Sequence, residues 1–246
     1  MTAAWLSAAD VRHLGAPEAP APSGLTRWGM VNEWRVALQP ARLATQRAAL
    51  AGAPRGDGSV VLDVPGWKAH ESTLAPLRGY LRRLGHDARG WGLGTNRGRP
   101  EADTERLLAR VRELADGSGQ PVALVGWSLG GVISREVARA APEAVRRVVT
   151  FGTPAVGGPT YTVGATSFGE AESRRAAAVL TDLDATDPIR VPLTVIFSRR
   201  DRIVSWPACL DRTSADVTHV EVGSTHVAMG LDPDVWRTVA QALAGG

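Results

Sequence analysis

One short stretch of the chain places a serine between two glycines in a G-x-S-x-G pattern, Gly126-Trp127-Ser128-Leu129-Gly130. An apolar run at 122–125 precedes it, and a helical pattern follows it. A direct strand-to-helix turn strains its central residue and packs the neighbouring chain closely on both sides. Glycines avoid that collision and leave the serine hydroxyl at the apex. The pattern predicts that Ser128 is a nucleophile; a plain glycine-rich turn is the alternative.

A serine nucleophile needs a base, because its hydroxyl is scarcely ionised at neutral pH. His226 follows the last predicted strand and precedes the last predicted helix, at the same carboxyl edge of the sheet as Ser128. His13 belongs to the N-terminal leader, His86 opens a strand at the opposite edge, and His219 lies within a strand. We therefore predict that His226 is the base; an ordinary surface or core histidine is the alternative.

The base needs a carboxylate to hold its tautomer and to stabilise its cation. Asp201 follows the penultimate predicted strand, at the same edge of the sheet, and is the predicted partner. Asp184 and Asp187 are weaker candidates because they precede that strand. The alternative for Asp201 is a turn residue paired with Arg199 or Arg202. The candidates occur along the chain in the order serine, aspartate, histidine.

An oxyanion formed on a substrate carbonyl needs hydrogen-bond donors. The amide of Leu129, directly after the serine, is one predicted donor. The amide of Trp67 is the second, because it lies in the loop after the first core strand, where Gly66 lets the backbone approach a substrate. Loss of one such donor typically raises the barrier by on the order of 3 kcal/mol.

Several large aromatic residues follow predicted strands or neighbour the candidate catalytic residues. Besides Trp67 they are Trp91, Trp127 and Trp206, and we predict that these side chains form an apolar pocket for an acyl chain or a ring system. His70 is a further candidate at the mouth of the pocket. Ordinary packing beneath the loops is the alternative for the whole group.

The sequence contains no pattern typical of a metal or nucleotide site. It has neither an H-E-x-x-H segment nor a cysteine cluster. The glycine-rich segment 92–98 lacks the G-x-G-x-x-G spacing, because Arg97 occupies a glycine position. We therefore predict no metal and no cofactor.

The composition is that of a globular protein. The chain has 246 residues, 44% of them hydrophobic, and its mean hydropathy is −0.08. The pI is about 9.7, but the net charge is only +3 and acidic residues are interspersed with the 27 arginines and single lysine, Lys68. We expect no nucleic-acid partner. No apolar run approaches the roughly 20 residues of a membrane span, so we expect none. The sequence does not predict an oligomeric state.

The compartment is predicted from two further features. The N-terminus lacks a basic start followed by an apolar segment, so we expect no signal peptide. Cys209 is the only cysteine, so no internal disulfide can form. Both features fit a cytoplasmic protein.

Strands and helices alternate from residue 59 onward, which predicts an α/β fold with a mostly parallel sheet flanked by helices. Residues 1–58 are predicted to be an irregular leader (1–28, with three prolines) followed by a helix at 30–51, packed on the core. Residues 59–246 form the main domain, with an insertion at about 155–187 predicted to be a small lid. The predicted strands are 59–64, 86–90, 122–125, 145–151, 193–197 and 217–222. The predicted helices are 73–84, 101–115, 128–140, 170–180 and 233–243.

The ordered set of segments PGW, GWSLGG, VVTFGTP, SRRDRIV and GSTHVAM resembles the α/β-hydrolase family, in particular its bacterial lipase- and esterase-like members. The resemblance covers about residues 59–244 and implies a serine hydrolase that acts on an ester or thioester. It departs from the family at Pro65-Gly66, where many members have His-Gly. The fold also hosts acyltransferases, thioesterases, cyclases and non-catalytic binding proteins, which are the alternatives.

Overall fold

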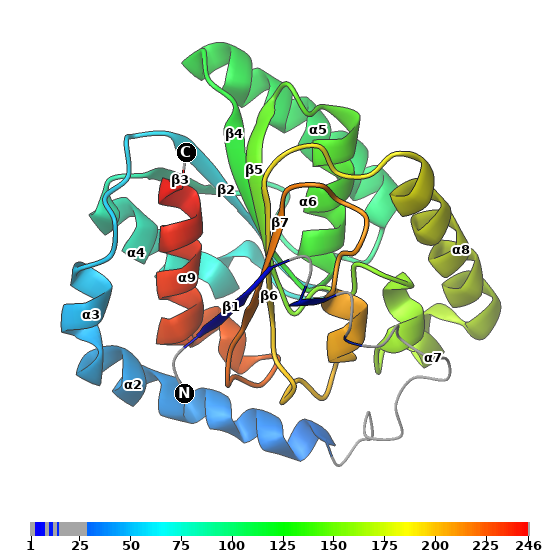
Figure 1. Ribbon diagram of the computed structural model, residues 1–246, viewed down its shortest axis with the longest axis horizontal. Helices are drawn as coiled ribbons and strands as arrows, with labels where there is room; N and C mark the ends of the chain where they lie inside the picture. The colour runs from blue at the N-terminus through cyan, green and yellow to red at the C-terminus, as the bar shows by residue number, and fades with distance from the viewer. Residues whose placement is uncertain (1–2, 8–9, 12–13, 15–28, 246) are drawn as a thin grey trace.

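The computed structural model describes residues 3–7, 10–11, 14 and 29–245. Within these residues seven strands form one sheet in the order β1-β7-β6-β5-β4-β2-β3 (Figure 1). All neighbouring strands are parallel except β1, which pairs antiparallel with β7. The strands are β1 (Ala4–Leu6), β2 (Val60–Val64), β3 (Asp87–Gly90), β4 (Val122–Trp127), β5 (Val145–Phe151), β6 (Leu193–Phe197) and β7 (Val217–Glu221).

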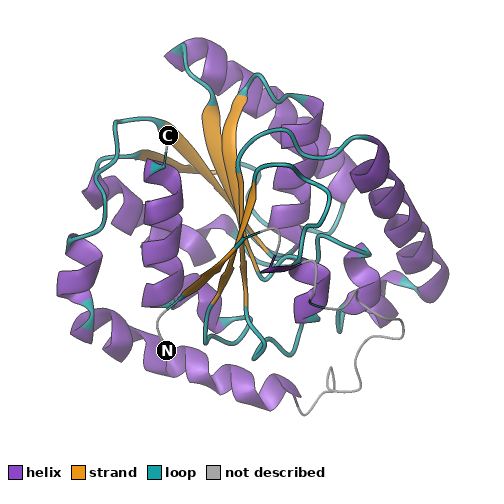
Figure 2. Cartoon of the chain, in the orientation of Figure 1, coloured by secondary structure: helices purple, strands orange, loops and turns teal. Residues whose placement is uncertain are grey.

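Helices cover both faces of the sheet (Figure 2). On one face α4 and α9 pack against the strands, and on the other α5 and α6 do so. The α-helices are α2 (Gln39–Thr45), α3 (Arg47–Ala51), α4 (Ala75–Leu84), α5 (Pro100–Ser118), α6 (Leu129–Ala140), α7 (Ala165–Phe168), α8 (Glu170–Thr186) and α9 (Pro233–Ala244). The 3-10 helices are η1 (Gly29–Leu38), η2 (Glu71–Leu74), η3 (Gly158–Tyr161), η4 (Trp206–Cys209) and η5 (Ala228–Leu231).

The strands β2, β4 and β6 are mostly apolar because their successive side chains enter two different cores. In β2, Leu62 and Val64 join the cluster beneath α5 and α6, whereas Val61 joins the cluster beneath α4 and α9. In β4, Leu124 and Val125 divide in the same way. Because β2 to β7 are parallel, their carboxyl ends lie at one edge of the sheet, and the residues predicted to do chemistry lie at this edge.

The N-terminal region differs from the sequence-based prediction. The leader was expected to be irregular, but Ala4–Leu6 form β1 and extend the sheet beside β7. The helix expected at 30–51 is divided into η1, α2 and α3, with Gln46 between the two α-helices. His13 and the leader prolines lie outside the described residues. The segment formed by η1 and α2, called the N-terminal extension below, runs along the edge of the sheet at which the parallel strands end (Figure 1).

The segment between β5 and β6 contains η3, α7 and α8. Its last helix is joined to α6 by buried ion pairs. Asp184 accepts hydrogen bonds from Arg135 and Arg139 at 2.9 and 2.7 Å, and Asp211 accepts one from Arg135 at 2.6 Å. The two bonds to Asp184 fix the C-terminal end of α8 to the helix that follows Ser128, and the bond to Asp211 joins that helix to the segment between η4 and β7. No helix in the described part of the chain is long and apolar enough to cross a membrane.

The stability of the fold is expected to depend on His219 in β7. Its side chain is fully buried, neither ring nitrogen has a hydrogen-bond partner within the described structure, and burial lowers its pKa from 6.5 to about 4. Below pH 6.5 the unfolded chain binds a proton at this residue that the folded chain excludes, so His219 lowers the stability as the pH falls from 6.5 to 4. The contribution of His219 is on the order of 3 kcal/mol, measurable by urea unfolding as a difference between the parent and a variant that lacks this histidine.

A His219→Leu variant provides the control, because it removes the titrating group from the same buried site. Relative to this variant, the parent is expected to lose stability as the pH falls from 6.5 to 4. The variant keeps a pH dependence of its own, because burial also lowers the pKa of His86 and raises that of Asp63 to about 6, two changes that act in opposite directions. Equal slopes for the parent and the variant would contradict this account of His219.

Candidate active site

Ser128 stands at the turn between β4 and α6 in the strained conformation that the sequence predicts. Its φ and ψ are 54° and −124°, in a region that non-glycine residues rarely occupy. A side chain at Gly130 would overlap the carbonyl oxygen of Val64, and one at Gly126 would overlap the backbone of Gly131. The tight turn therefore needs both glycines, and it leaves the Ser128 side chain partly exposed.

Asp201 and His226 form a buried pair at the same edge of the sheet. Asp201 Oδ2 lies 2.7 Å from His226 Nδ1, and each residue is only 4% exposed. Asp201 Oδ1 accepts hydrogen bonds from the amides of Ile203 and Val204, both at 2.8 Å. The carboxylate is thus fixed by its own turn and presents its second oxygen to the imidazole, an arrangement that holds Nδ1 protonated and leaves Nε2 as the basic nitrogen.

The electrostatic surroundings of His226 favour its cation. Burial alone would lower the pKa of His226, but the charge and hydrogen bond of Asp201, together with the charge of Glu33, outweigh it. The pKa of His226 is consequently raised above its ordinary value. An imidazole in this setting can accept a proton from a hydroxyl and hold it during a reaction.

The end of β5 connects the serine turn to the histidine. The Ser128 amide donates to the carbonyl of Phe151 at 2.9 Å. A side chain on the next residue, Gly152, would lie 3.0 Å from His226 Nδ1. The indole of Trp127 lies 5.7 Å from the imidazole of His226, measured between ring centroids. The turn that carries Ser128 therefore lies beside the Asp201–His226 pair.

The loop predicted to supply the second oxyanion donor lies beside Ser128. A side chain at Gly66 would be 3.2 Å from Ser128 Cβ, so the bare glycine permits this approach. Trp67 follows directly and is partly exposed, as is Leu129 after the serine. Lys68 has a φ of 61° and its ammonium lies 4.1 Å from the ring centroid of Trp67.

Asn96 holds this loop in place, a role that the sequence did not indicate. Its side chain is fully buried and donates from Nδ2 to the carbonyl of Pro65 at 2.9 Å. Its backbone accepts from the amide of Lys68 at 2.8 Å and donates to the carbonyl of Ala69 at 3.0 Å. The only sequence signal was an asparagine inside the glycine-rich segment 92–98, and that segment revealed nothing about its distant partner.

The residues predicted to bind substrate divide into different environments. Trp127 is partly exposed beside His226. Trp206 is partly exposed, but it stacks on Phe197 at 5.8 Å between ring centroids. Trp91 is fully buried in the core and donates to the carbonyl of Gly94, so it offers no surface to a substrate. That prediction failed because the strand end alone does not show whether the following ring turns inward.

His70 also has a local structural role. It is the N-terminal cap of η2: its Nδ1 accepts from the Ser72 amide at 3.2 Å and lies 3.0 Å from the Ser72 hydroxyl.

The two weaker candidates for the carboxylate partner of His226 bind other residues. Asp184 pairs with the arginines of α6, and Asp187 pairs with Arg190 at 2.6 Å.

Two further features bear on what the site can hold. Within the described part of the chain, no group of three or more histidine, cysteine or acidic residues is placed to bind a metal.

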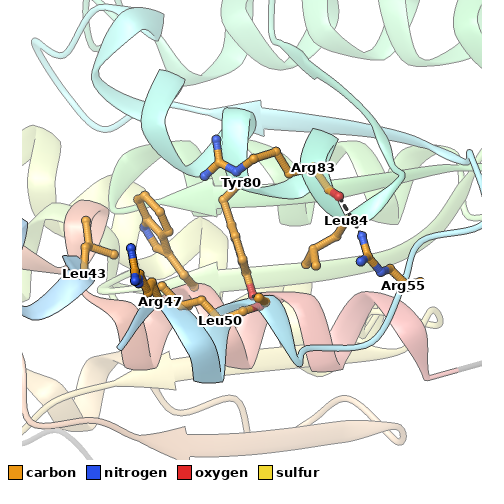
Figure 3. A pocket seen from close by; sticks show the side chains of 9 residues that line it. Leu43, Arg47, Leu50, Arg55, Tyr80, Arg83 and Leu84 are labelled. Carbon is orange, nitrogen blue, oxygen red and sulfur yellow. Dashed lines mark hydrogen bonds between the residues drawn. The ribbon is translucent and has the colours of Figure 1, made fainter. Parts of the chain in front are cut away.

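A cavity of about 360 Å³ lies between α3, α4 and α9 (Figure 3). The rings of Tyr80 and Trp236, which line it, stack at 5.4 Å between ring centroids. Its described lining includes none of the candidate catalytic residues, so it is separate from the candidate active site.

Comparisons with known proteins agree with this architecture. A family model described as the alpha/beta hydrolase fold matches residues 82–190. A solved structure from the pair LipS and LipT, described as metagenome-derived lipolytic enzymes, has a TM-score of 0.59 at 17% identity. The alignment covers 77% of this chain and 95% of that one. The chain has the α/β-hydrolase fold.

Similarity in sequence is limited to a shorter stretch. A triacylglycerol lipase of Pseudarthrobacter phenanthrenivorans is 45% identical over 56 residues, which is 22% of this chain and 18% of the lipase. The matched stretch thus spans less than a fifth of that relative. The thioesterase domain from the curacin biosynthetic pathway has a TM-score of 0.53 at 12% identity, covering 78% of this chain and 93% of that domain. At such identities the structural likeness establishes the α/β-hydrolase fold alone.

Proposed function

We propose that the protein is a serine hydrolase that cleaves a carboxylic ester or thioester through an acyl-enzyme on Ser128. The observation that carries the proposal is the buried Asp201–His226 pair, 2.7 Å apart, at the same sheet edge as a strained and accessible serine. The lipase relative and the lipolytic structural neighbour support an acyl ester as the substrate class.

In the proposed reaction His226 takes the proton of Ser128 as the serine oxygen attacks the substrate carbonyl. The amides of Leu129 and Trp67 stabilise the oxyanion, and Asp201 stabilises the imidazolium. Collapse of the tetrahedral intermediate expels the alcohol or thiol, which receives the proton from His226. A water molecule, deprotonated by His226, then attacks the acyl-enzyme and releases the carboxylic acid and free Ser128.

A second candidate keeps the same residues but replaces water by another acceptor. The thioesterase domain of a biosynthetic pathway has the same fold, which favours this possibility. In such an acyltransferase or cyclase, the segment 155–187 would act as a lid that limits water. Its opening would be confined to the part before Asp184, because that residue is held by Arg135 and Arg139.

The substrate acyl group is proposed to contact Trp127, whose partly exposed indole lies 5.7 Å from the His226 imidazole between ring centroids. Trp206 and His70 stay predicted binding residues, although each has a structural contact of its own. The cytoplasmic location likewise stays a prediction.

A series of p-nitrophenyl acyl esters of increasing chain length tests the proposal. We expect p-nitrophenol release and a free carboxylic acid, with a preferred chain length that reports the size of the acyl site. Reaction with a fluorophosphonate should add one label per chain, and peptide mapping should place it on Ser128. A product that carries an added alcohol or amine in place of water would favour the acyltransferase. No label and no turnover of any ester would contradict both.

A further inference from the structure

Glu33, in the N-terminal extension, contacts the backbone of the candidate base across 193 residues of sequence. Its Oε1 accepts a hydrogen bond from the amide of His226 at 3.2 Å, and its Oε2 accepts one from the amide of Val227 at 2.8 Å. Both oxygens of one carboxylate therefore bind two successive amides. This contact uses a segment that lies outside the 59–244 region resembling the hydrolase family.

The extension that carries Glu33 is itself attached next to the histidine turn. Arg42 of α2 donates to Asp232 at 2.5 Å and to Asp234 at 2.9 Å, at the start of α9. η1 packs against η5, the 3-10 helix that directly follows His226 and Val227. The position of Glu33 is thus set by a charged contact that does not involve His226.

The histidine turn is held on two sides. Before the histidine, the Ser198 hydroxyl donates to the carbonyl of Ser224 at 2.6 Å. At the histidine, Asp201 binds the imidazole and Glu33 binds the amide. An imidazole moves with its own backbone. The hydrogen bond from the His226 amide to Glu33 therefore restricts the position of the ring, in addition to the contact of the ring with Asp201.

The charges around His226 come from different elements. Asp201 lies in the turn after β6, and Glu33 lies in η1; both favour the imidazolium. Arg200 lies on the outside of the turn, where its guanidinium donates to the carbonyl of Gly223 at 3.3 Å. Glu33 therefore supplies a second negative charge whose effect on the ring has the same sign as that of Asp201.

We propose that Glu33 is a positioning residue for His226, which fixes the backbone of the histidine turn and adds negative charge beside the imidazolium formed during catalysis. The inference rests on the proposed function, because it assumes that His226 is the base. The N-terminal extension thereby becomes part of the active-site architecture. A role confined to attaching the extension would stabilise the fold without altering the titration of His226.

The test is a Glu33→Gln variant, which removes the charge and leaves one oxygen acceptor. We expect kcat for a p-nitrophenyl ester to fall by about 10-fold with KM nearly unchanged, because the position and charge of His226 stabilise the transition state rather than the bound substrate. Since a base acts only when neutral, kcat/KM falls as the pH drops through the pKa of His226. Removal of a charge that raises this pKa should move the fall to lower pH.

NMR titration of ¹³C-labelled histidine provides a readout that does not depend on activity. We expect the pKa of His226, assigned with a His226→Gln variant, to be lower in Glu33→Gln than in the parent. Glu143→Gln is the matched control, because Glu143 is exposed in the turn before β5 and its loss changes the net charge equally. This control should leave kcat, the pH profile and the His226 titration unchanged.

The outcomes separate the two proposals. An unchanged His226 titration in a folded Glu33→Gln variant would overturn the role of Glu33, even if the melting temperature and kcat fell together. If the parent cleaves no ester, the proposed function fails, and the NMR titration still decides whether Glu33 acts on His226. If Glu33→Gln does not fold, Glu33→Asp replaces it. That variant keeps the charge but retracts it by one methylene, so a lower kcat and a lower His226 pKa than in the parent are expected, and parental values would overturn the inference.

Discussion

Replacement of Ser128 by alanine is expected to lower kcat for an ester that the parent cleaves by on the order of 10⁴-fold or more. The substitution removes one oxygen atom, the one that would form the acyl-enzyme. It leaves Gly126, Gly130 and the Asp201–His226 pair unchanged, so the fold and its melting temperature should be retained. The measurement is steady-state turnover of a p-nitrophenyl ester, combined with the mass of the protein after fluorophosphonate treatment.

Ser134→Ala is the matched control in the same helix. The Ser134 hydroxyl is fully buried and donates to the carbonyl of Gly130 at 2.8 Å, so it stabilises the first turns of α6 rather than facing a substrate. We expect this variant to keep its turnover and its label, with at most a small loss of stability. Wild-type turnover in Ser128→Ala would rule out the acyl-enzyme mechanism. Label retained in Ser128→Ala would place the reactive serine elsewhere.

The sheet could be predicted from sequence because its strands have a local signature. Apolar runs bounded by turn residues predicted β5 and β6 with the bounds that the structure has. The alternation of strands and helices also predicted that the serine turn and the histidine turn lie at one edge of the sheet, because the carboxyl ends of parallel strands lie together there. These features depend on neighbours in the sequence.

The features that sequence analysis missed depend on contacts between distant segments. β1 has only three residues and becomes a strand through pairing with β7, more than 200 positions later. Asn96 and Glu33 have no distinguishing neighbours, and each acquires its role from a loop that another part of the chain brings to it. Trp91 directly follows β3 and Trp127 ends β4, yet the Trp91 ring is buried in the core and the Trp127 ring is partly exposed. Only the packing of the loops distinguishes them.

Asp201→Asn is expected to lower kcat by on the order of 10⁴-fold while the fold is retained, because the two oxygens of Asp201 have different partners. Oδ1 accepts the amides of Ile203 and Val204, and an asparagine oxygen can accept the same bonds. Oδ2 faces His226 Nδ1 at 2.7 Å, where the asparagine would present a donating amide. The imidazole would then carry its proton on Nε2, the nitrogen that must accept the proton of Ser128.

The substitution also removes the main charge that raises the pKa of His226, so the acid limb of kcat/KM should move to lower pH. Asp187→Asn serves as the control, because Asp187 also precedes the histidine in sequence but pairs with Arg190. Turnover and pH profile should match the parent in that control. The melting temperature separates the role of Asp201 in its turn from its role at His226. We expect little change in Asp201→Asn. We expect a clear fall in Asp201→Ala, because that variant also loses the hydrogen bonds from the amides of Ile203 and Val204. Full activity in a folded Asp201→Asn variant would show that Asp201 serves only its turn, and that the imidazole is oriented without it.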